Sequence, residues 1–254
     1  MHLDRFNLSG KVALITGSGR GIGLAIGQAL AEAGAAVVLH DIDLPVAEAA
    51  AKAITDRGGR AVAFGGDITD LTLPPRLIAQ ATTAFGGLHI LVNNASIQTR
   101  IKWLDVDLQT IQTQINADLV SPILFCQCAA GIFKTQQFGR IINIGSVQQL
   151  KGNTDMFPYS ICKGALKTLT TALARDLAKD KITVNLLAPG WMRTHRNQND
   201  FADEKDFMGK GRWIPLGRIG EASDCAGAAL LLCSDAGEYI TGQSIYIDGG
   251  MSVR

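Results

Sequence analysis

Apolar and polar positions follow two alternating patterns along the chain. Seven short apolar runs, rich in β-branched residues, predict strands that are buried on both faces: Val12–Thr16, Ala36–His40, Ala61–Phe64, His89–Val92, Arg140–Ile144, Ile182–Leu187 and Ser244–Ile247. Between them lie six stretches with helical spacing, at about Gly21–Ala33, Pro45–Arg57, Leu73–Phe85, Asp107–Thr135, Pro158–Ala178 and Ala222–Ser234. Gly34 and Gly58 mark the ends of two helices, and Pro122 predicts a bend in the longest one.

Strands that alternate with helices pair in parallel, and the helices cover both faces of the sheet. No repeat, low-complexity tract or linker divides the 254 residues. We therefore expect an α/β fold in which residues 1–254 form one domain, a doubly wound, Rossmann-like parallel sheet of about seven strands. The ligand site is expected outside the carboxyl ends of the strands, where the strand order reverses.

The composition narrows the class of protein. Hydrophobic residues make up 47% of the chain and charged residues 19%, which argues against a disordered or fibrous protein. The formal net charge is +1 and no long basic run occurs, so nothing favours binding to nucleic acid or to an anionic membrane. The chain shows neither a secretory signal nor an unbroken apolar run of ~18–20 residues, and we expect a cytoplasmic protein.

Cysteine and histidine give no sign of a metal or disulfide site. The five cysteines are an odd number without a disulfide-like spacing, and the four histidines are scattered. Cys126 and Cys128 lie in the apolar run Ile123–Ile132, so we expect reduced core thiols, with a redox or metal role as the alternative. We expect no bound metal.

A glycine-rich turn, Thr16–Gly23, follows the first predicted strand and opens a helix. Glycines permit positive φ and a close approach of the backbone to a phosphate, and a helix N-terminus directs free N–H groups toward that anion. A lone glycine cluster is often an ordinary tight turn, but this one has the strand–turn–helix setting of dinucleotide binding. The turn therefore predicts a dinucleotide cofactor.

An acidic residue at the end of the second strand indicates which dinucleotide binds. The Asp41 carboxylate can accept hydrogen bonds from ribose hydroxyls and would repel a 2′-phosphate, which favours NAD over NADP. Arg20 offers a compensating positive charge, and Asp41 could instead be a turn aspartate at a strand end. Asp67 and Ile68 follow the third strand and fit either a contact with the adenine edge or an ordinary loop.

Together these motifs resemble those of the short-chain dehydrogenase/reductase family, in its compact form, over nearly the whole chain. Thr16–Gly23 resembles the family's TGxxxGxG pattern, and Asn93–Ser96 resembles its NNAG segment. Tyr159–Lys163 resembles its YxxxK pair, and the further matches are Ser146, Asn116, Asn185, Pro189, Gly190 and Thr194. Two positions depart from the pattern, since Ser96 stands where glycine is usual and His89 where aspartate is common.

The resemblance implies an oxidoreductase that transfers a hydride between NAD(H) and a small hydroxyl or carbonyl compound. The implied cofactor-binding residues are Gly17, Ser18, Gly19, Arg20, Gly21, Ile22, Gly23, Asp41, Asp67, Ile68, Asn93, Ala95, Tyr159, Lys163, Pro189, Gly190, Met192 and Thr194. The implied catalytic residues are Ser146, Tyr159, Lys163 and Asn116.

These four residues suit a reaction that develops negative charge on a carbonyl oxygen. Tyr159 is the expected general acid/base, but the ordinary pKa of a tyrosine, about 10, is too high for proton exchange near neutrality. Lys163 lies one helical turn later, where its ammonium would lower the pKa of Tyr159, and the resemblance implies that it also binds the nicotinamide ribose. Ser146 would orient the substrate oxygen, and the resemblance implies that Asn116 supports a proton relay. Each residue alone could be structural, whereas the combined pattern favours catalysis.

The polar, irregular segment 190–213 is expected to be a substrate lid. Trp191 and Trp213 would line the substrate pocket or seal the lid onto the rest of the protein. The residues that could bind hydroxyl groups or form a solvated loop are Gln148, Gln149, Asn153 and Asp155. We expect a sugar, a polyol or a related secondary alcohol as the substrate.

Two other functions stay open. One is reduction of a 3-oxoacyl thioester on acyl carrier protein. The resemblance implies that such enzymes have arginines at the positions that Gln137 and Asp180 occupy here. The basic surface that would bind an acidic carrier is therefore missing. The other is a sensor that binds NAD(H) without turnover, which the intact catalytic set disfavours.

The resemblance also implies that the long helices pair between subunits, so we expect a homotetramer, with a dimer as the alternative.

Overall fold

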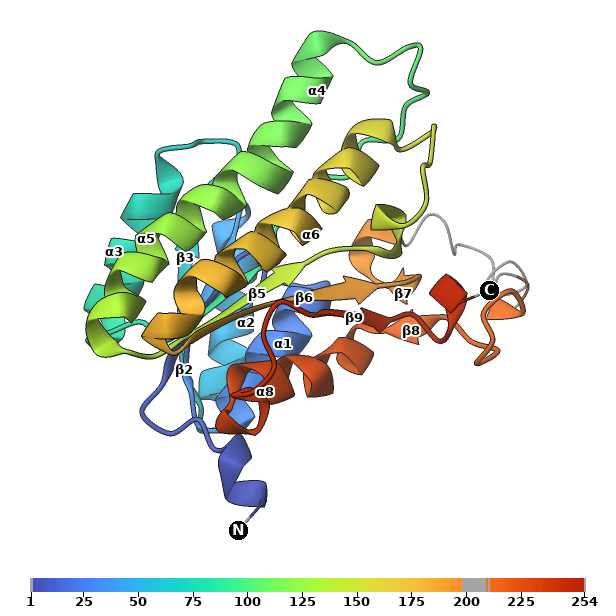
Figure 1. The fold of residues 1–254 in the computed structure, drawn as a ribbon. Coiled ribbons are helices and arrows are strands. Elements are labelled where there is room, and N and C mark those ends of the chain that lie inside the picture. Colours follow the sequence, from blue (N-terminus) through green and yellow to red (C-terminus); the bar gives the residue numbers. More distant parts are fainter. Residues whose placement is uncertain (1, 198–208, 210, 254) are drawn as a thin grey trace.

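The computed structural model describes residues 2–197, 209 and 211–253, and its centre is a seven-stranded sheet (Figure 1). The strands are β1 (Val12–Ile15), β2 (Ala36–Asp41), β3 (Arg60–Gly65), β4 (Ile90–Asn93), β5 (Gly139–Ile144), β6 (Ile182–Pro189) and β9 (Ser244–Ile247). They lie in the order β3-β2-β1-β4-β5-β6-β9, and every neighbouring pair is parallel. The predicted Rossmann-like α/β fold is confirmed.

Helices cover both faces of this sheet. One layer consists of α1 (Gly21–Glu32), α2 (Leu44–Thr55) and α8 (Ala226–Cys233). The other consists of α3 (Leu73–Phe85), α4 (Leu108–Ile115), α5 (Ser121–Gln136) and α6 (Phe157–Leu177), and it is drawn above the sheet in Figure 1. A separate pair of short strands, β7 (Met192–Arg193) and β8 (Gly220–Glu221), lies near the carboxyl end of β6.

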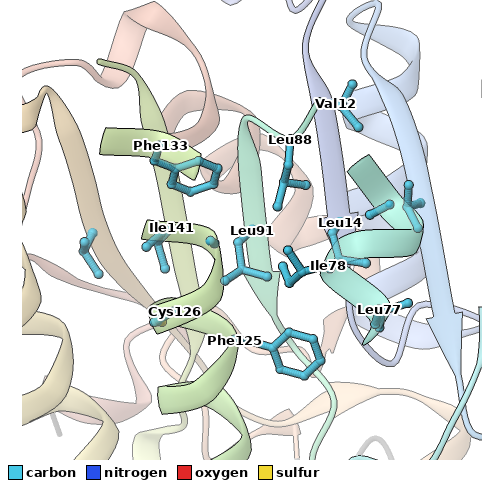
Figure 2. Packing of buried hydrophobic residues seen from close by; sticks show 14 of the residues in the cluster. Val12, Leu14, Leu77, Ile78, Leu88, Leu91, Phe125, Cys126, Phe133 and Ile141 are labelled. Carbon is cyan, nitrogen blue, oxygen red and sulfur yellow. The ribbon is translucent and has the colours of Figure 1, made fainter. Parts of the chain in front are cut away.

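Successive residues of a strand point to opposite faces of the sheet, and here both faces are buried. In β1, Val12 and Leu14 share a core with residues of α3 and α5, whereas Ala13 and Ile15 share a core with residues of α1. Figure 2 shows the first of these two cores, in which Phe125 of α5 is fully buried. This burial on both sides explains why the strands are continuous apolar runs instead of alternating ones.

The strand order reverses between β1 and β4. From β1 the chain moves outward through β2 to β3, and it then returns to β4 on the other side of β1. The connections that follow β1 and β4 therefore lead to opposite sides, and a crevice opens between them at the carboxyl ends of the strands.

The longest helical stretch contains an irregular turn. A π-helical turn, Asn116–Val120, joins α4 to α5 without a break, and in it the Ser121 N–H bonds to the Asn116 carbonyl five residues earlier. Pro122 follows at once, has no N–H to donate, and would press its ring against the carbonyl of Asp118 in a regular helix. Near Pro122, where the sequence predicts a bend, the structure thus has a π-helical turn that ends two residues earlier.

The helix formed by residues 108–136 also has a partly exposed apolar side. Among the described residues it is the one helix whose length and hydropathy, 29 residues and a mean of 1.4, would suffice to cross a membrane. It packs against α3 and α6, yet only 39% of its apolar window is buried. Core helices also meet this criterion, so these values are weak evidence of a membrane span.

Two histidines of the sheet are held as hydrogen-bond acceptors. Nδ1 of the buried His40 accepts from the Gly17 N–H at 3.4 Å, and its Nε2 lies 2.9 Å from the Gly66 carbonyl. His89, just before β4, accepts a hydrogen bond from the Val12 N–H at 3.1 Å, so this departure from the family pattern links β4 to β1. Burial lowers the pKa of both histidines, which favours their neutral forms in the folded protein.

We expect the free energy of unfolding to fall as the pH drops below about 6.5, the ordinary pKa of histidine. When folding lowers a histidine pKa, the unfolded chain binds protons more readily, so this stability is present above that pH and lost below it. The buried His40 contributes at most about 1.4 kcal/mol per pH unit, and the more exposed His89 contributes less because solvent screens it.

Urea unfolding at about pH 7.5 and about pH 5.5 measures this difference in stability. His40→Gln removes the titrating ring and should make the difference smaller. His2→Gln, at an exposed histidine, should leave it unchanged. The explanation fails if His40→Gln and the parent lose the same stability between the two pH values.

Candidate active site

The carboxyl ends of the strands open onto one cavity of about 870 Å³. Residues at or just after the ends of β2, β4, β5 and β6 line it, including Asp41, Asn94, Ile144 and Pro189. The cavity lies where the strand order reverses, which is the place that the predicted topology indicates for a ligand.

The glycine turn between β1 and α1 packs closely against the end of β4. Gly17 has a φ of +62°, and a Cβ there would lie 2.7 Å from the Ala95 Cα. The Asn94 amide donates hydrogen bonds to the carbonyls of Thr16 (2.9 Å) and Gly17 (2.7 Å). The N-cap residue of α1 is Arg20, and its side chain makes no capping hydrogen bond with the described residues. The first N–H groups of α1 are therefore available to an anion. The turn therefore fits the pyrophosphate of a dinucleotide.

The acidic residue at the end of β2 lies beside this turn. One Asp41 oxygen accepts a hydrogen bond from the Gly19 N–H and the other from the Asp43 N–H, both at 3.2 Å. Arg20 lines the cavity as Asp41 does, and its guanidinium lies 3.5 Å from the Asp43 carboxylate. A carboxylate and a guanidinium thus both lie where the adenosine ribose of a dinucleotide is expected.

Three polar side chains from β5 and α6 line the same cavity. Ser146 follows β5, and its Oγ accepts a hydrogen bond from the Gln148 N–H at 3.2 Å, which leaves the hydroxyl proton available to a ligand. Tyr159 lies in the first turn of α6 and Lys163 one turn later, and both are buried. The structure therefore brings together the predicted serine, tyrosine and lysine.

The Lys163 ammonium is held beside the phenol. Its Nζ lies 5.3 Å from the centre of the Tyr159 ring and donates a hydrogen bond to the Ile144 carbonyl at 3.0 Å. The Asp118 carboxylate lies 3.6 Å from the same Nζ. The Lys163 side chain is only 4% exposed, so its charge acts where solvent weakens Coulomb interactions little.

The fourth predicted catalytic residue is in a different position. Asn116 is only partly buried and is not among the described residues that line the cavity. The side chain of this turn that reaches Lys163 belongs to Asp118, whose carboxylate lies 3.6 Å from the Lys163 Nζ. Asp118 is thus the residue of this helix whose carboxylate approaches Lys163, and the role of Asn116 in a proton relay stays a prediction. The available signal in the sequence was the single acidic residue of this helix, which has no other charged residue before Lys134, since a buried charge needs a partner.

Most of the predicted cofactor residues line the cavity: Gly17, Arg20, Gly21, Ile22, Asp41, Asp67, Ile68, Ala95, Tyr159, Lys163, Pro189, Gly190, Met192 and Thr194. Four of them are absent from the lining that the described residues form: Ser18, Gly19, Gly23 and Asn93. Ser18 donates to the Ile15 carbonyl (2.7 Å), and Asn93 donates to Asn143 Oδ1 (2.9 Å). These two side chains thus hold the turn and the sheet together.

The predicted substrate residues are only partly brought together. Gln148 and Trp191 line the cavity, whereas Trp213 is 67% exposed and is absent from the lining that the described residues form. Residues 198–208 and 210, which belong to the predicted lid, lie outside the described part of the chain.

Two arginines that sequence reasoning missed, Arg100 and Arg196, also line the cavity. Arg196 donates hydrogen bonds to the Ser96 hydroxyl (2.9 Å) and to the Ser96 carbonyl (2.6 Å). Ser96, which departs from the family pattern, is therefore the partner of an arginine 100 positions away. No spacing in the sequence reveals a contact over that separation.

Known proteins that resemble this chain are reductases and dehydrogenases, which agrees with the chemistry of this site. A family model described as enoyl-(acyl carrier protein) reductase matches residues 17–252. The chain is 35% identical to the 2-dehydro-3-deoxy-D-gluconate 5-dehydrogenase of Dickeya dadantii, over 100% of both chains. The structure of a gluconate 5-dehydrogenase from Burkholderia cenocepacia in complex with NADP and tartrate has a TM-score of 0.93, with 35% identity and 100% of both chains covered. A 3-oxoacyl (acyl-carrier-protein) reductase from Agrobacterium tumefaciens with NADP bound has a TM-score of 0.94, with 35% identity over 98% of this chain and 97% of that chain.

The chain therefore belongs to the short-chain dehydrogenase/reductase family. It is an NAD(P)-dependent oxidoreductase that transfers a hydride between a nicotinamide cofactor and a hydroxyl or carbonyl compound. The fold does not by itself select the substrate, because the gluconate dehydrogenase and the acyl reductase resemble this chain equally well.

We expect Gly17→Ala to weaken NADH binding at least about tenfold, because a side chain at a positive φ would meet the Ala95 backbone. Fluorescence titration with NADH measures the dissociation constant. Gly131→Ala, in α5, makes the same change where nothing lies within 4 Å of a Cβ, and it should bind NADH as the parent does. Equal affinities in the two variants would contradict the assignment of the glycine turn to the cofactor.

Proposed function

We propose that this protein interconverts a secondary hydroxyl and a ketone on a small, free sugar, polyol or sugar acid, with NAD(H) as the preferred cofactor. The observation that supports the reaction most directly is the shared cavity of Ser146, Tyr159 and Lys163 beside a glycine turn that suits a dinucleotide. Two of the compared proteins are dehydrogenases of gluconate and of 2-dehydro-3-deoxy-D-gluconate, which are compounds of this class.

The side chains of the cavity supply the proton chemistry of this reaction. A bound nicotinamide cofactor accepts or donates the hydride. During oxidation, the Ser146 hydroxyl orients the substrate oxygen by a hydrogen bond, and the Tyr159 phenolate takes the proton of that oxygen as the adjacent C–H hydride leaves. The Lys163 ammonium stabilises the phenolate, and during reduction Tyr159 returns the proton to the same oxygen.

Polar and cationic side chains around the cavity favour a hydroxylated substrate that carries a carboxylate. The Oε1 atom of Gln148 is buried without a hydrogen-bond partner among the described residues, so a substrate hydroxyl can supply one. Asn153 and Asp155 line the same cavity and can bind further hydroxyls. Arg100 and Arg196 would attract a carboxylate. A sugar acid suits all of these groups.

An acyl carrier protein is less well supported as the carrier of the substrate. The family resemblance implies arginines at the positions of Gln137 and Asp180 in reductases that use it. Asp180 instead has a carboxylate 3.9 Å from Lys134, which offsets a positive charge on this surface. An acidic carrier would therefore meet a weaker basic patch on this protein.

Asp41 supports the preference for NAD(H). Its carboxylate lines the cavity at the end of β2, where it can bind ribose hydroxyls and would repel a 2′-phosphate. The two solved structures compared above hold NADP, so we propose the preference for this chain on the basis of its own side chain.

We expect kcat/KM with NADH to exceed that with NADPH at least about tenfold, which corresponds to roughly 1.4 kcal/mol. Rates measured side by side at equal, low cofactor concentrations give the ratio. Asp41→Ser removes the negative charge and should lower the ratio, whereas Asp56→Ser, at an exposed aspartate after α2, should not. Equal rates with both cofactors in the parent would refute the role given to Asp41.

We also propose that the protein is a cytoplasmic homotetramer. The partly exposed apolar side of the helix at residues 108–136 and the half-exposed Ile161 of α6 fit pairing of these helices between subunits. A dimer is the alternative, and light scattering on the purified protein distinguishes the two.

A panel of polyols, sugar acids and 3-oxoacyl thioesters, followed by the absorbance of NADH, tests the proposed reaction. We expect turnover with a sugar acid or polyol and a loss of about 10³-fold in Tyr159→Phe, because no hydroxyl remains to exchange the proton. This variant should still bind NADH. Tyr239→Phe changes a fully exposed tyrosine in the same way and should keep full activity.

The other outcomes separate the alternatives. Turnover with the thioester alone would favour the reductase that acts on acyl carrier protein. Cofactor binding without turnover of any compound in the panel would favour a sensor. Undiminished turnover in Tyr159→Phe would show that Tyr159 is not the acid/base.

A further inference from the structure

Asp118 lies in the π-helical turn between α4 and α5 with its side chain fully buried. One carboxylate oxygen accepts a hydrogen bond from the Ile97 N–H at 2.9 Å. The other, Oδ2, has no hydrogen-bond partner among the described residues and lies 3.6 Å from the Lys163 Nζ. A buried carboxylate oxygen is therefore paired by charge alone with the lysine beside Tyr159.

A buried carboxylate is costly unless another charge compensates it. Burial raises the pKa of Asp118, and the positive charge of Lys163, the Ile97 N–H and the charge of Arg196 oppose that shift. Cys162 of α6 adds no charge near neutrality, because burial raises the pKa of its thiol to about 11. Lys163 is thus the main group that compensates Asp118.

Lys163 in turn depends on Asp118 for the direction of its ammonium. An ammonium has three N–H donors. One of them bonds to the Ile144 carbonyl at 3.0 Å, and the attraction of Asp118 draws a second toward the π-helical turn. The third is left for the cavity, where the cofactor ribose and the Tyr159 oxygen are expected.

We propose that Asp118 is a positioning residue that holds the Lys163 ammonium in place and limits, through its negative charge, how strongly that ammonium favours the Tyr159 phenolate. The inference rests on the proposed role of Tyr159 as the acid/base. Opposite charges 3.6 Å apart partly cancel at a third group, and the Lys163 Nζ lies 5.3 Å from the Tyr159 ring centre. A neutral amide in place of the carboxylate leaves the full lysine charge acting on the phenol.

The effect of Asp118 is therefore expected in the pH dependence. Without the Asp118 charge, the Lys163 ammonium is expected to stabilise a negative charge on the Tyr159 oxygen more strongly. The charged or titratable groups that act on the carboxylate are Cys162 and Lys163 from α6 and Arg196 from the segment after β7, and Tyr159 lies beside Lys163. Removing the Asp118 charge changes the balance among them without removing any of the reacting groups.

Asp118→Asn removes the charge and keeps an oxygen that can accept from the Ile97 N–H. The chain has three tyrosines, so Tyr239→Phe together with Tyr246→Phe leaves Tyr159 as the one remaining tyrosine. In this background the phenolate absorbance follows Tyr159 directly, without substrate or cofactor. We expect Asp118→Asn to lower the midpoint of the phenolate titration by about one pH unit. The acid limb of kcat/KM for alcohol oxidation should move in the same direction.

Asp235→Asn makes the same chemical change at another ion pair. Its carboxylate lies 3.4 Å from the Nη2 of Arg140, whose side chain is 5% exposed. Arg140 lies at the opposite end of β5 from Ile144, and neither member of this pair is among the described residues that line the cavity. Asp235→Asn should therefore leave the midpoint unchanged, whatever its effect on stability.

An unchanged or raised midpoint in folded Asp118→Asn would overturn the proposal. If circular dichroism shows that this variant does not fold, Asp118→Ser replaces it, because serine also removes the charge. If neither variant folds, Asp118 is a purely structural residue and the proposal is overturned. The phenolate titration needs no substrate, so it can be read even if Tyr159→Phe keeps full turnover. In that case the proposed function would fail separately from the link between Asp118 and Lys163.

Discussion

Parallel pairing of the seven strands is the constraint on which the site depends. Every strand of a parallel sheet ends at the same edge, so the glycine turn after β1, Asp41 of β2 and Ser146 after β5 meet although they are far apart in the chain. The helices that return the chain to the other edge begin at this one, and α6 places Tyr159 there in its first turn. The direction of backbone hydrogen bonding thus assembles the cavity before any side chain takes part in the chemistry.

The two ends of β5 each hold a buried cation, and the difference between them shows what the site requires. At the carboxyl end, Lys163 bonds to the Ile144 carbonyl, lies beside Tyr159 and lines the cavity. At the amino end, Arg140 pairs with Asp235 and lies 4.3 Å from the centre of the Phe138 ring. Both charges are compensated as burial demands, but only Lys163 faces a space that a ligand can enter. A buried charge becomes useful for chemistry at the edge where the strands end.

Several parts of this arrangement depend on short stretches of sequence and could be predicted from them. The strands are buried on both faces, so they appear as unbroken apolar runs. The turn at Gly17 needs a positive φ, which glycine permits. Tyr159 and Lys163 are four residues apart in a helix and therefore share a face wherever that helix packs. The approach of Asp118 to Lys163 could not be predicted in this way, because a spacing of 3.6 residues per turn holds no information about a π-helical turn or about which side of it faces α6.

By itself, then, the sequence determined the order of strands and helices, the parallel sheet, the glycine turn and the tyrosine–lysine pair. Each of these depends on neighbours within one turn or one strand, where backbone geometry and side-chain periodicity act directly. Only the tertiary structure decided that Asp118 compensates Lys163, that Arg196 bonds to Ser96 and that Trp213 stays outside the cavity. The Asp118–Lys163 and Arg196–Ser96 contacts join distant segments, and the position of Trp213 depends on how its segment lies against the rest of the protein. All three therefore follow from the packing of elements, and no local pattern in the sequence specifies how packed elements are rotated relative to each other.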